Sequence, residues 1–221
     1  MNFKGIELPP AYYQDEWVYI IHGDCREILP LIPDKSIDLV LTDPPYGNST
    51  DYKSYVDDKD NLNYLVSKVI PEVMRIASIC FVTCGVANMW LYPNPTWVLS
   101  WVVPAGSGSG PWGFCCWQPV LAYGKDPYLA NGKGRKPDTL VRYEKASNEA
   151  HPCAKPLTVW KWLISRGNIE GGLLLDPFLG SGTTAVASKH LNRYCIGIEI
   201  EEKYCEIAAK RCCQSVMELN V

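Results

Sequence analysis

The chain has 221 residues, of which 47% are apolar and 20% are charged, and its formal net charge is −3. This length allows a full hydrophobic core in a single domain without disulfides or a structural metal, and the negative charge argues against a protein that coats nucleic acid indiscriminately. No apolar run approaches the roughly 18 residues that span a bilayer, and the first ten residues lack a signal-peptide core, so we expect a cytoplasmic protein that does not enter a membrane.

Short apolar runs alternate with helical segments along the chain, which predicts an α/β domain with a largely parallel sheet. The runs expected to form strands span residues 17–22, 37–42, 79–83, 97–103, 115–123, 173–175 and 194–198. The helices are expected over residues 62–77, 157–166 and 201–217. Two stretches rich in turn residues, 106–110 and 124–138, are expected to be loops.

Acidic residues follow four of the expected strands. They are Asp24, Asp43, Asp176 and Glu199. A single acid in this position is ordinary, because Asp and Glu favour turns and helix starts. In an open α/β sheet, however, ligands bind beyond the carboxyl ends of the strands. Four acids at that edge therefore predict a binding site.

Residues 173–191 follow the order strand, acid, glycine turn and helix. Gly180 and Gly182 allow a tight turn, and free N–H groups at the helix start can receive an anionic group. No lysine follows Gly182, so this is not a phosphate-binding P-loop. Glu199 lies 23 residues after Asp176, close to the spacing of about 20 at which an acid bonds a ribose. The pattern favours an adenosine-type cofactor with a free ribose.

The sequence Asp-Pro-Pro-Tyr stands at residues 43–46, directly after an expected strand. The prolines give a rigid backbone without N–H donors, which leaves the Asp43 carboxylate and the Pro44 carbonyl as acceptors. Tyr46 offers a flat surface for stacking. Two acceptors beside a stacking surface suit an amine on an aromatic ring, because they can orient its delocalised lone pair toward an electrophile. The alternative is a plain Pro-Pro turn.

These motifs resemble the β-class S-adenosylmethionine-dependent DNA amino-methyltransferases, which methylate adenine N6 or cytosine N4. The motifs that carry the resemblance are DPPY at 43–46, DPFLGSGTT at 176–184, GIE at 197–199, HGDC at 22–25 and HPCAKPL at 151–157. The resemblance implies a Rossmann-like, doubly wound, mostly parallel seven-stranded sheet with helices on both faces. It also implies a circularly permuted motif order, since the catalytic motif comes first, within one domain over residues 1–221.

The resemblance assigns a role to each motif residue. Catalysis is expected to rest on Asp43, Pro44, Pro45 and Tyr46, with the base flipped out of the duplex and stacked on Tyr46. The residues that it places around S-adenosylmethionine, or the product S-adenosylhomocysteine, are Asp24, Cys25, Asp43, His151, Lys155, Asp176, Pro177, Phe178, Gly180, Ser181, Gly182, Thr183 and Glu199. The methyl group is expected to move by direct displacement, without a covalent enzyme intermediate.

The resemblance links Asp at position 43 mostly with adenine N6, whereas cytosine-N4 enzymes more often carry Ser there. We therefore expect a site-specific adenine-N6 DNA methyltransferase, with cytosine N4 as the alternative. An RNA base as acceptor and a non-catalytic DNA-binding relative also stay open. The resemblance further implies a prokaryotic or viral source, is compatible with a homodimer, and includes restriction–modification enzymes without indicating an endonuclease partner here.

The region left for recognising the DNA target is short, at about residues 104–150. Within it, residues 124–145 carry six basic and three acidic residues, and this net positive charge suits phosphate contact. The basic residues expected to contact nucleic acid are Lys125, Lys133, Arg135, Lys136 and Arg142. A solvated charged loop is the ordinary alternative. Five of the eight tryptophans lie between Trp90 and Trp117, and one of them is a candidate to fill the gap left by a flipped base, although core packing is commoner.

The ten cysteines include no CxxC pair, and without a signal peptide we expect reduced thiols. Cys80 and Cys84 are four residues apart without a matching His or Cys pair, so no metal is expected. Cys153 follows Pro152, as in the nucleophile motif of cytosine-C5 methyltransferases. It stands outside the catalytic position and is assigned no role.

Overall fold

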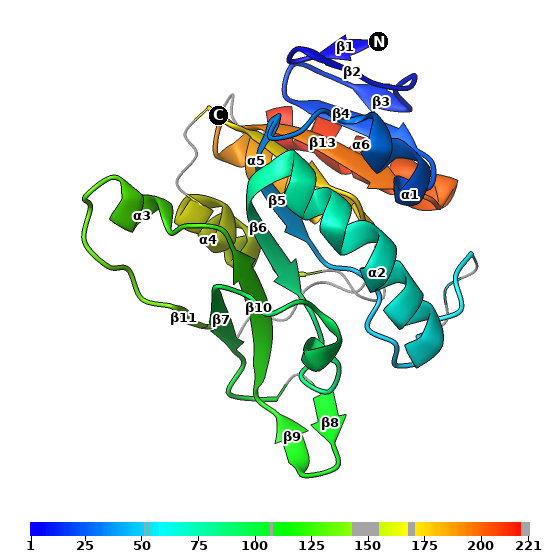
Figure 1. Cartoon of the computed structure of the whole chain (residues 1–221). Helices are drawn as coiled ribbons and strands as arrows, with labels where there is room; N and C mark the ends of the chain where they lie inside the picture. Colours follow the sequence, from blue (N-terminus) through cyan, green and yellow to red (C-terminus); the bar gives the residue numbers. More distant parts are fainter. Residues whose placement is uncertain (51, 53, 107, 143–154, 168–170, 218–221) are drawn as a thin grey trace.

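The computed structural model describes residues 1–50, 52, 54–106, 108–142, 155–167 and 171–217. Its main sheet has the strand order β11-β7-β10-β6-β5-β12-β13-β4-β3 (Figure 1). These strands are β3 (Tyr13–Gln14), β4 (Val18–His22), β5 (Ile37–Thr42), β6 (Ala77–Thr83), β7 (Trp97–Val102), β10 (Trp117–Tyr123), β11 (Thr139–Val141), β12 (Leu173–Asp176) and β13 (Tyr194–Glu199). Two hairpins lie outside this sheet, and they pair β1 (Asn2–Phe3) with β2 (Ile6–Glu7) and β8 (Gly108–Gly110) with β9 (Gly113–Cys115).

Most neighbouring strands of the sheet run parallel, as expected. The run from β6 through β5, β12 and β13 to β4 is parallel throughout, β10 is antiparallel to both of its neighbours, and β11 is parallel to β7. The sheet has nine strands in the described residues, not the expected seven. The additional strands, β3 and β11, have two and three residues at the two edges. They are too short to show an apolar period in the sequence.

Helices cover both faces of the sheet. They are α1 (Cys25–Ile28), α2 (Lys59–Ile76), α3 (Pro127–Ala130), α4 (Leu157–Gly167), α5 (Thr183–His190) and α6 (Glu202–Met217), with 3-10 turns at Leu29–Leu31 and Met89–Leu91. Val40 packs in the cluster that contains α2, whereas Leu39 and Leu41 pack with α4 on the other face. Val18 and Ile20 lie against α5 and α6. Because successive side chains of a strand point to opposite faces, two covered faces require nearly continuous apolar runs.

The chain leaves the centre of the sheet in two directions. From β5 it continues to β6 and the β10–β7 pair on one side, and from β12 it continues to β13 on the side of β4. The connections after β5 and β12 therefore diverge, which leaves a crevice at the carboxyl ends of these two strands. Asp43 follows β5 and Asp176 ends β12, so the two acids flank this crevice.

Both stretches expected to be loops contain regular structure. Residues 108–115 form the β8–β9 hairpin, and α3 lies within residues 124–138. Since β10 is antiparallel to β6, with Val120 opposite Thr83 and Tyr123 opposite Cys80, the hairpin before β10 stands at the end of the sheet where β6 finishes. The segment after β10 stands at the other end, and Figure 1 shows the hairpin and α3 well apart.

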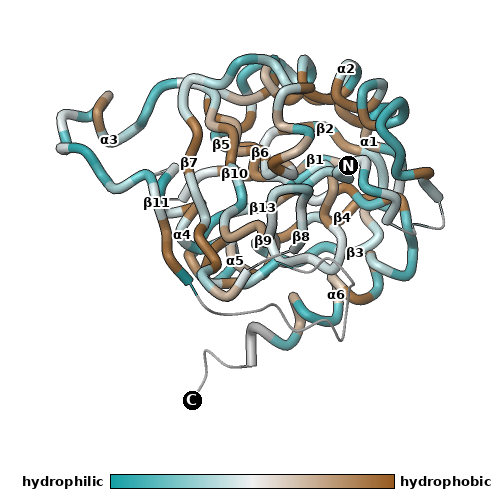
Figure 2. Tube along the Cα trace, turned by 90° about the horizontal axis from the view of Figure 1, so that it is seen from below, coloured by the Kyte–Doolittle hydropathy of each residue, from teal (hydrophilic) through white to brown (hydrophobic). Residues whose placement is uncertain are grey.

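Apolar residues lie mainly in the interior of the molecule and hydrophilic residues mainly on its outside. Figure 2 shows brown, apolar strands inside the molecule, and a mostly teal segment around α3 that stands away from it. No helix in the described ranges is both long and apolar enough to cross a membrane. The cysteines of these ranges form no disulfide, and Cys80 and Cys84 are among the buried ones. No group of three or more possible metal ligands lies together in the same ranges. Cys153 is outside them.

Candidate active site

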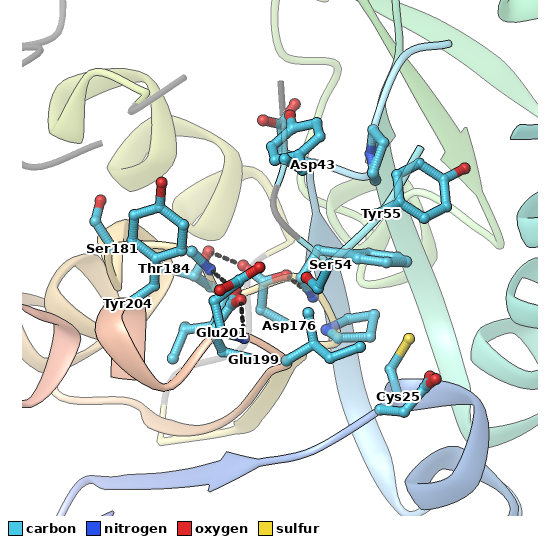
Figure 3. A pocket seen from close by; sticks show the side chains of 18 of the residues that line it. Cys25, Asp43, Ser54, Tyr55, Asp176, Ser181, Thr184, Glu199, Glu201 and Tyr204 are labelled. Carbon is cyan, nitrogen blue, oxygen red and sulfur yellow. Dashed lines mark hydrogen bonds between the residues drawn. The ribbon is translucent and has the colours of Figure 1, made fainter. Parts of the chain in front are cut away.

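A pocket lies at the carboxyl ends of β5, β12 and β13, and Figure 3 shows Asp43, Asp176 and Glu199 around it. The residues of the expected cofactor set that line it are Asp24, Cys25, Asp43, Lys155, Asp176, Pro177, Phe178, Gly180, Ser181, Thr183 and Glu199. Pro45 lines it as well, whereas Pro44 is buried and does not. His151 falls outside the described residues. The fold thus brings the motif around Asp43 and the motif around Asp176 to one pocket.

The Asp43 carboxylate is held by three donors. The Thr83 hydroxyl donates to Oδ1, and the Tyr46 hydroxyl donates to the same oxygen at 2.6 Å. Lys155 Nζ lies 2.5 Å from Oδ2. Thr83 ends β6, the neighbour of β5, and its hydroxyl also lies 3.2 Å from the Thr42 carbonyl. The carboxylate is therefore fixed in orientation at the edge of the pocket.

Tyr46 is not part of the pocket lining, although its hydroxyl contacts Asp43. Burial raises the pKa of Tyr46 well above its ordinary value, so its hydroxyl keeps its proton and donates to Asp43. Lys155 Nζ lies 5.1 Å from the centre of the ring, and Asn88 donates to the Tyr46 carbonyl at 2.6 Å. The Lys155 ammonium group thus contacts both the Asp43 carboxylate and the Tyr46 ring. The resemblance implies that the target base binds to these same two groups.

Asp176 joins the two motifs through hydrogen bonds. It is 2% exposed, and it accepts from the Thr42 hydroxyl at 2.8 Å, the Phe178 N–H at 3.0 Å and the Thr184 hydroxyl at 2.5 Å. Thr184 in turn accepts from the Trp160 indole at 2.8 Å. Burial raises the pKa of Asp176 to about 6 despite these donors. Its oxygens are engaged with β5 and α5, so this acid holds the crevice together as well as lining it.

Glu199, at the end of β13, is 8% exposed. Its two oxygens accept from the backbone N–H groups of Gly180 and Glu201, each at 2.8 Å. Burial raises the pKa of Glu199 above its ordinary value. A carboxylate offers about four lone-pair sites, so each oxygen can still accept a hydrogen bond from a ligand hydroxyl.

Gly182 is the one residue of the expected cofactor set within the described residues that does not line the pocket, and a side chain at this position would face α6. It precedes α5 with φ of +85°, and a Cβ atom there would lie 2.7 Å from Ala208 Cβ and 2.9 Å from Ala208 Cα. The glycine is needed because α5 and α6 approach closely at this point and because its backbone is left-handed. The motif in the sequence contains this glycine, but it does not reveal that the glycine packs against α6.

The pocket is also lined by Asp24 and Cys25, which follow β4. Asp24 caps α1 by accepting from the Arg26 N–H at 2.9 Å, and it forms an ion pair with the Arg26 guanidinium, which lowers the pKa of Asp24. Burial raises the pKa of the Cys25 thiol to about 12. This cysteine is therefore a neutral, apolar wall of the pocket at neutral pH.

Further lining residues lie outside the site residues assigned from the sequence, although the loop that carries Tyr52 and Tyr55 was a candidate to close over the flipped base. They are Gly23, Arg26, Tyr52, Ser54, Tyr55, Leu65, Trp160, Leu179, Thr184, Ile200, Glu201 and Tyr204. Glu201 Oε1 and the Tyr55 hydroxyl are buried without a hydrogen-bond partner, so each can bond a ligand. Glu201 was detectable as a second acid two residues beyond Glu199. Tyr55 belongs to the polar loop after Tyr46, whose role the sequence left open.

The expected nucleic-acid residues do not gather at this pocket. Those exposed on the segment after β10 are Lys125, Lys133, Arg135 and Lys136. Because β10 is antiparallel to β6, this segment starts at the opposite end of the sheet from Asp43. Arg142 follows β11, which runs parallel to β7 and hence toward the pocket end. The charge pattern of the sequence could not predict which of these residues lie near the pocket, because their positions depend on the directions of β10 and β11.

The chain is similar to known DNA methylases. The family model described as DNA methylase matches residues 87–210. The type II methyltransferase M.HpaI of Haemophilus parainfluenzae is 27% identical over 232 residues, which cover 87% of this chain and 73% of that protein. The type II methyltransferase M2.DpnII of Streptococcus pneumoniae is 24% identical, over 95% of both chains.

Solved structures share the fold. The PvuII cytosine-N4-specific DNA methyltransferase aligns with a TM-score of 0.72 and 18% identity, over 91% of this chain and 88% of that chain. M1.HpyAVI in its complex with SAM aligns with a TM-score of 0.62 and 22% identity, over 88% and 99% of the two chains. At these identities the likeness establishes the architecture, which is the α/β sheet expected from the sequence.

Proposed function

The chain belongs to the DNA methylase family, whose model matches more than half of its length, and we propose that it transfers a methyl group from S-adenosylmethionine to adenine N6 in DNA. One observation carries the proposal. The reaction loop at residues 43–46 and the cofactor loop at residues 176–184 contribute to the same pocket, with Asp43 beside Asp176 at the divergence of β5 and β12. Methyl transfer requires the donor and the acceptor to lie side by side, and one shared pocket allows this.

S-adenosylmethionine fits the side chains of the pocket. Glu201 Oε1 is buried there without a partner and Glu199 keeps free lone pairs, so both acids would accept hydrogen bonds from the ribose hydroxyls. Cys25 and Phe178 offer apolar contact for the adenine ring. When bound, the cofactor supplies an electrophilic methyl group on a sulfonium. The complex of M1.HpyAVI with SAM shows a similar fold holding this molecule.

The residues at the reaction end orient the acceptor. The Asp43 carboxylate would accept a hydrogen bond from the target amine, with the Pro44 carbonyl as second acceptor, and the lone pair would then point toward the methyl group. No enzyme nucleophile is required. Cys25 lines the pocket, but its pKa of about 12 keeps it a neutral thiol and hence a poor nucleophile. Direct transfer from sulfur to nitrogen follows.

The carboxylate at position 43 supports adenine as the target base, because the resembling enzymes associate Asp there with adenine N6. The PvuII enzyme, which is cytosine-N4-specific, has the same fold, so the fold serves both bases. The base is therefore inferred from the side chain at this one position.

The test is methyl transfer from labelled S-adenosylmethionine to unmethylated duplex DNA, followed by digestion and mass spectrometry of the nucleosides. We expect N6-methyladenine, and N4-methylcytosine alone would overturn the choice of adenine. Asp43→Ala should abolish transfer while cofactor binding changes little. Glu16→Ala, at an exposed acid away from the pocket, is the matched control and should behave as wild type. No methylated nucleoside from the wild type, despite cofactor binding, would overturn the proposed activity.

A further inference from the structure

The β8–β9 hairpin carries two aromatic side chains that the fold does not use. Trp112 is 100% exposed and Phe114 is 83% exposed. Phe114 lies opposite Ser109 in the hairpin, and serine is too small to cover the ring. Burying aromatic surface is strongly favourable. No described part of this chain covers these two side chains.

Trp112 stands at the tip of the hairpin. Gly110 pairs with Gly113, so Pro111 and Trp112 form a two-residue turn between them. The proline ring fixes its own φ angle, and Gly113 adopts a φ of +120° that other residues avoid. An exposed aromatic on a restricted turn loses little conformational freedom when it binds, which favours a specific contact over a loose one.

The hairpin projects from the same end of the sheet at which the active-site pocket lies. Val120 of β10 lies opposite Thr83, whose hydroxyl contacts Asp43. Trp112 precedes Val120 by eight residues, so at about 3.3 Å per residue the tip stands at most roughly 26 Å from Val120 along the direction of the strand. Figure 1 shows β8 and β9 extending past the end of β10 in this direction. A duplex placed over the pocket would meet the hairpin.

The chemistry of this surface favours bases over phosphates. No Lys, Arg, Asp, Glu or His occurs from residue 76 to residue 124, so the hairpin offers no cation for a phosphate and no anion that repels one. Phosphate contacts normally use Lys and Arg, whereas aromatic side chains stack on bases of any sequence. The glycines on both strands let the backbone come close to a partner. The DNA component that matches a neutral aromatic tip is the face of a base.

We propose that Trp112 inserts into the DNA duplex and stacks in the gap left when the target base turns out toward Asp43. The inference rests on the proposed function, because this gap exists only if a base leaves the duplex. Trp112 does not touch the reacting atoms and is a positioning residue, which keeps the duplex open while the base is in the pocket. Phe114, two residues after Trp112 on β9, extends the stacking surface.

Binding to a duplex with a gap built in tests this role without knowledge of the target sequence. We would measure the affinity of the full chain for a fluorescent duplex with one abasic site and for the matching intact duplex, by anisotropy. The wild type should bind the abasic duplex about tenfold more tightly, since stacking on bases is worth that much or more. Trp112→Ala should lose this preference, and Trp112→Phe should retain most of it. Trp97→Ala, which removes an exposed tryptophan at the first residue of β7, is the control and should keep the preference.

Methyl transfer to unmethylated plasmid DNA provides the second readout. Trp112→Ala should lower kcat/KM by about tenfold or more while the Kd for the cofactor stays unchanged, and Trp112→Phe should restore most of the loss. A fully exposed side chain contributes little to folding, so the variant should keep the wild-type unfolding curve.

Three results would overturn the inference. The first is an abasic preference that Trp112→Ala leaves intact. The second is an equal loss of affinity for both duplexes, which would indicate a general contact. The third is a change of oligomeric state in Trp112→Ala without a change in abasic preference, because the hairpin would then bind a second copy of the chain. A wild type that shows the Trp112-dependent preference but transfers no methyl group would refute the proposed function instead.

Discussion

Lys155 Nζ lies 2.5 Å from Asp43 Oδ2 in an ion pair that joins residues 112 positions apart in the chain. The two side chains are 16% and 17% exposed. The resemblance places Lys155 near the methionine end of the cofactor. In the structure it lines the pocket but contacts the acceptor carboxylate and the Tyr46 ring. A target amine that binds Asp43 must therefore replace or share this ammonium group.

Replacing Lys155 separates a role in catalysis from a role in cofactor binding. In Lys155→Met the Asp43 carboxylate loses the donor that holds Oδ2, so we expect kcat to fall about tenfold, or about 1.4 kcal/mol. The Kd for S-adenosylhomocysteine should stay within about twofold of wild type. Single-turnover methyl transfer and calorimetric titration measure the two quantities. A weaker Kd with unchanged kcat would assign Lys155 to the methionine end instead.

Thr83 should orient Asp43 through its hydroxyl group. Thr83→Val keeps the shape of the side chain and removes the hydrogen bond to Oδ1, so we expect kcat to fall about fivefold to tenfold, as for a lost hydrogen bond of about 1 kcal/mol. Thr83→Ser keeps the hydroxyl and should retain most of the activity. Equal rates for the valine and serine variants would show that Asp43 is oriented without Thr83.

Glu199 should govern cofactor affinity. In Glu199→Gln one oxygen becomes an NH2 group, which cannot accept from a backbone N–H or a ribose hydroxyl. We expect the Kd for S-adenosylhomocysteine to rise at least about tenfold, since hydrogen bonds to charged groups are worth about 1.5–3 kcal/mol. Glu202→Gln, on the exposed start of α6, is the control for lost charge. An unchanged Kd in Glu199→Gln would remove this acid from the cofactor site.

Asp176 should make the stability of the protein without cofactor depend on pH. Burial raises its pKa from 3.8 to about 6 in the folded state, so the protonated form is favoured by folding. This stabilisation is fully present below about pH 3.8 and is lost as the pH rises through about 6. Between pH 5 and pH 7 the free energy of unfolding should fall by about 1 kcal/mol more in the wild type than in Asp176→Asn. Urea unfolding at the two pH values measures this, and parallel changes in both proteins would contradict it.

Gly182 should be required for packing against α6. Gly182→Ala places a Cβ atom 2.9 Å from the Ala208 backbone and also strains a left-handed residue. Gly132→Ala introduces similar strain, at a φ of +68°, but its Cβ meets nothing within 4 Å. We expect the first variant to lose at least about 2 kcal/mol more of the free energy of unfolding than the second. Equal losses, measured by urea unfolding, would attribute the effect to backbone strain alone.

Features that depend only on neighbouring residues could be predicted from the sequence alone. Long strands such as β5 and β13 follow from apolar runs that end in Asp43 and Glu199, and the motif chemistry at residues 43–46 and 176–184 indicated an acceptor loop and a cofactor loop. Each of these features needs only a few consecutive side chains. Their meeting in one pocket was also foreseeable, because parallel strands present their carboxyl ends at one edge.

The contacts between groups that are distant in the chain could be seen only in the folded protein. The sheet order and the direction of β10 place Lys125 and Lys136 at the far end from Asp43 and place Trp112 at the near end. The packing of α5 on α6 explains Gly182, and Lys155 reaches Asp43 across 112 positions. These relationships depend on long-range strand pairing and helix packing. The residues on either side of a position do not encode them, whereas a strand period or a turn motif is local by nature.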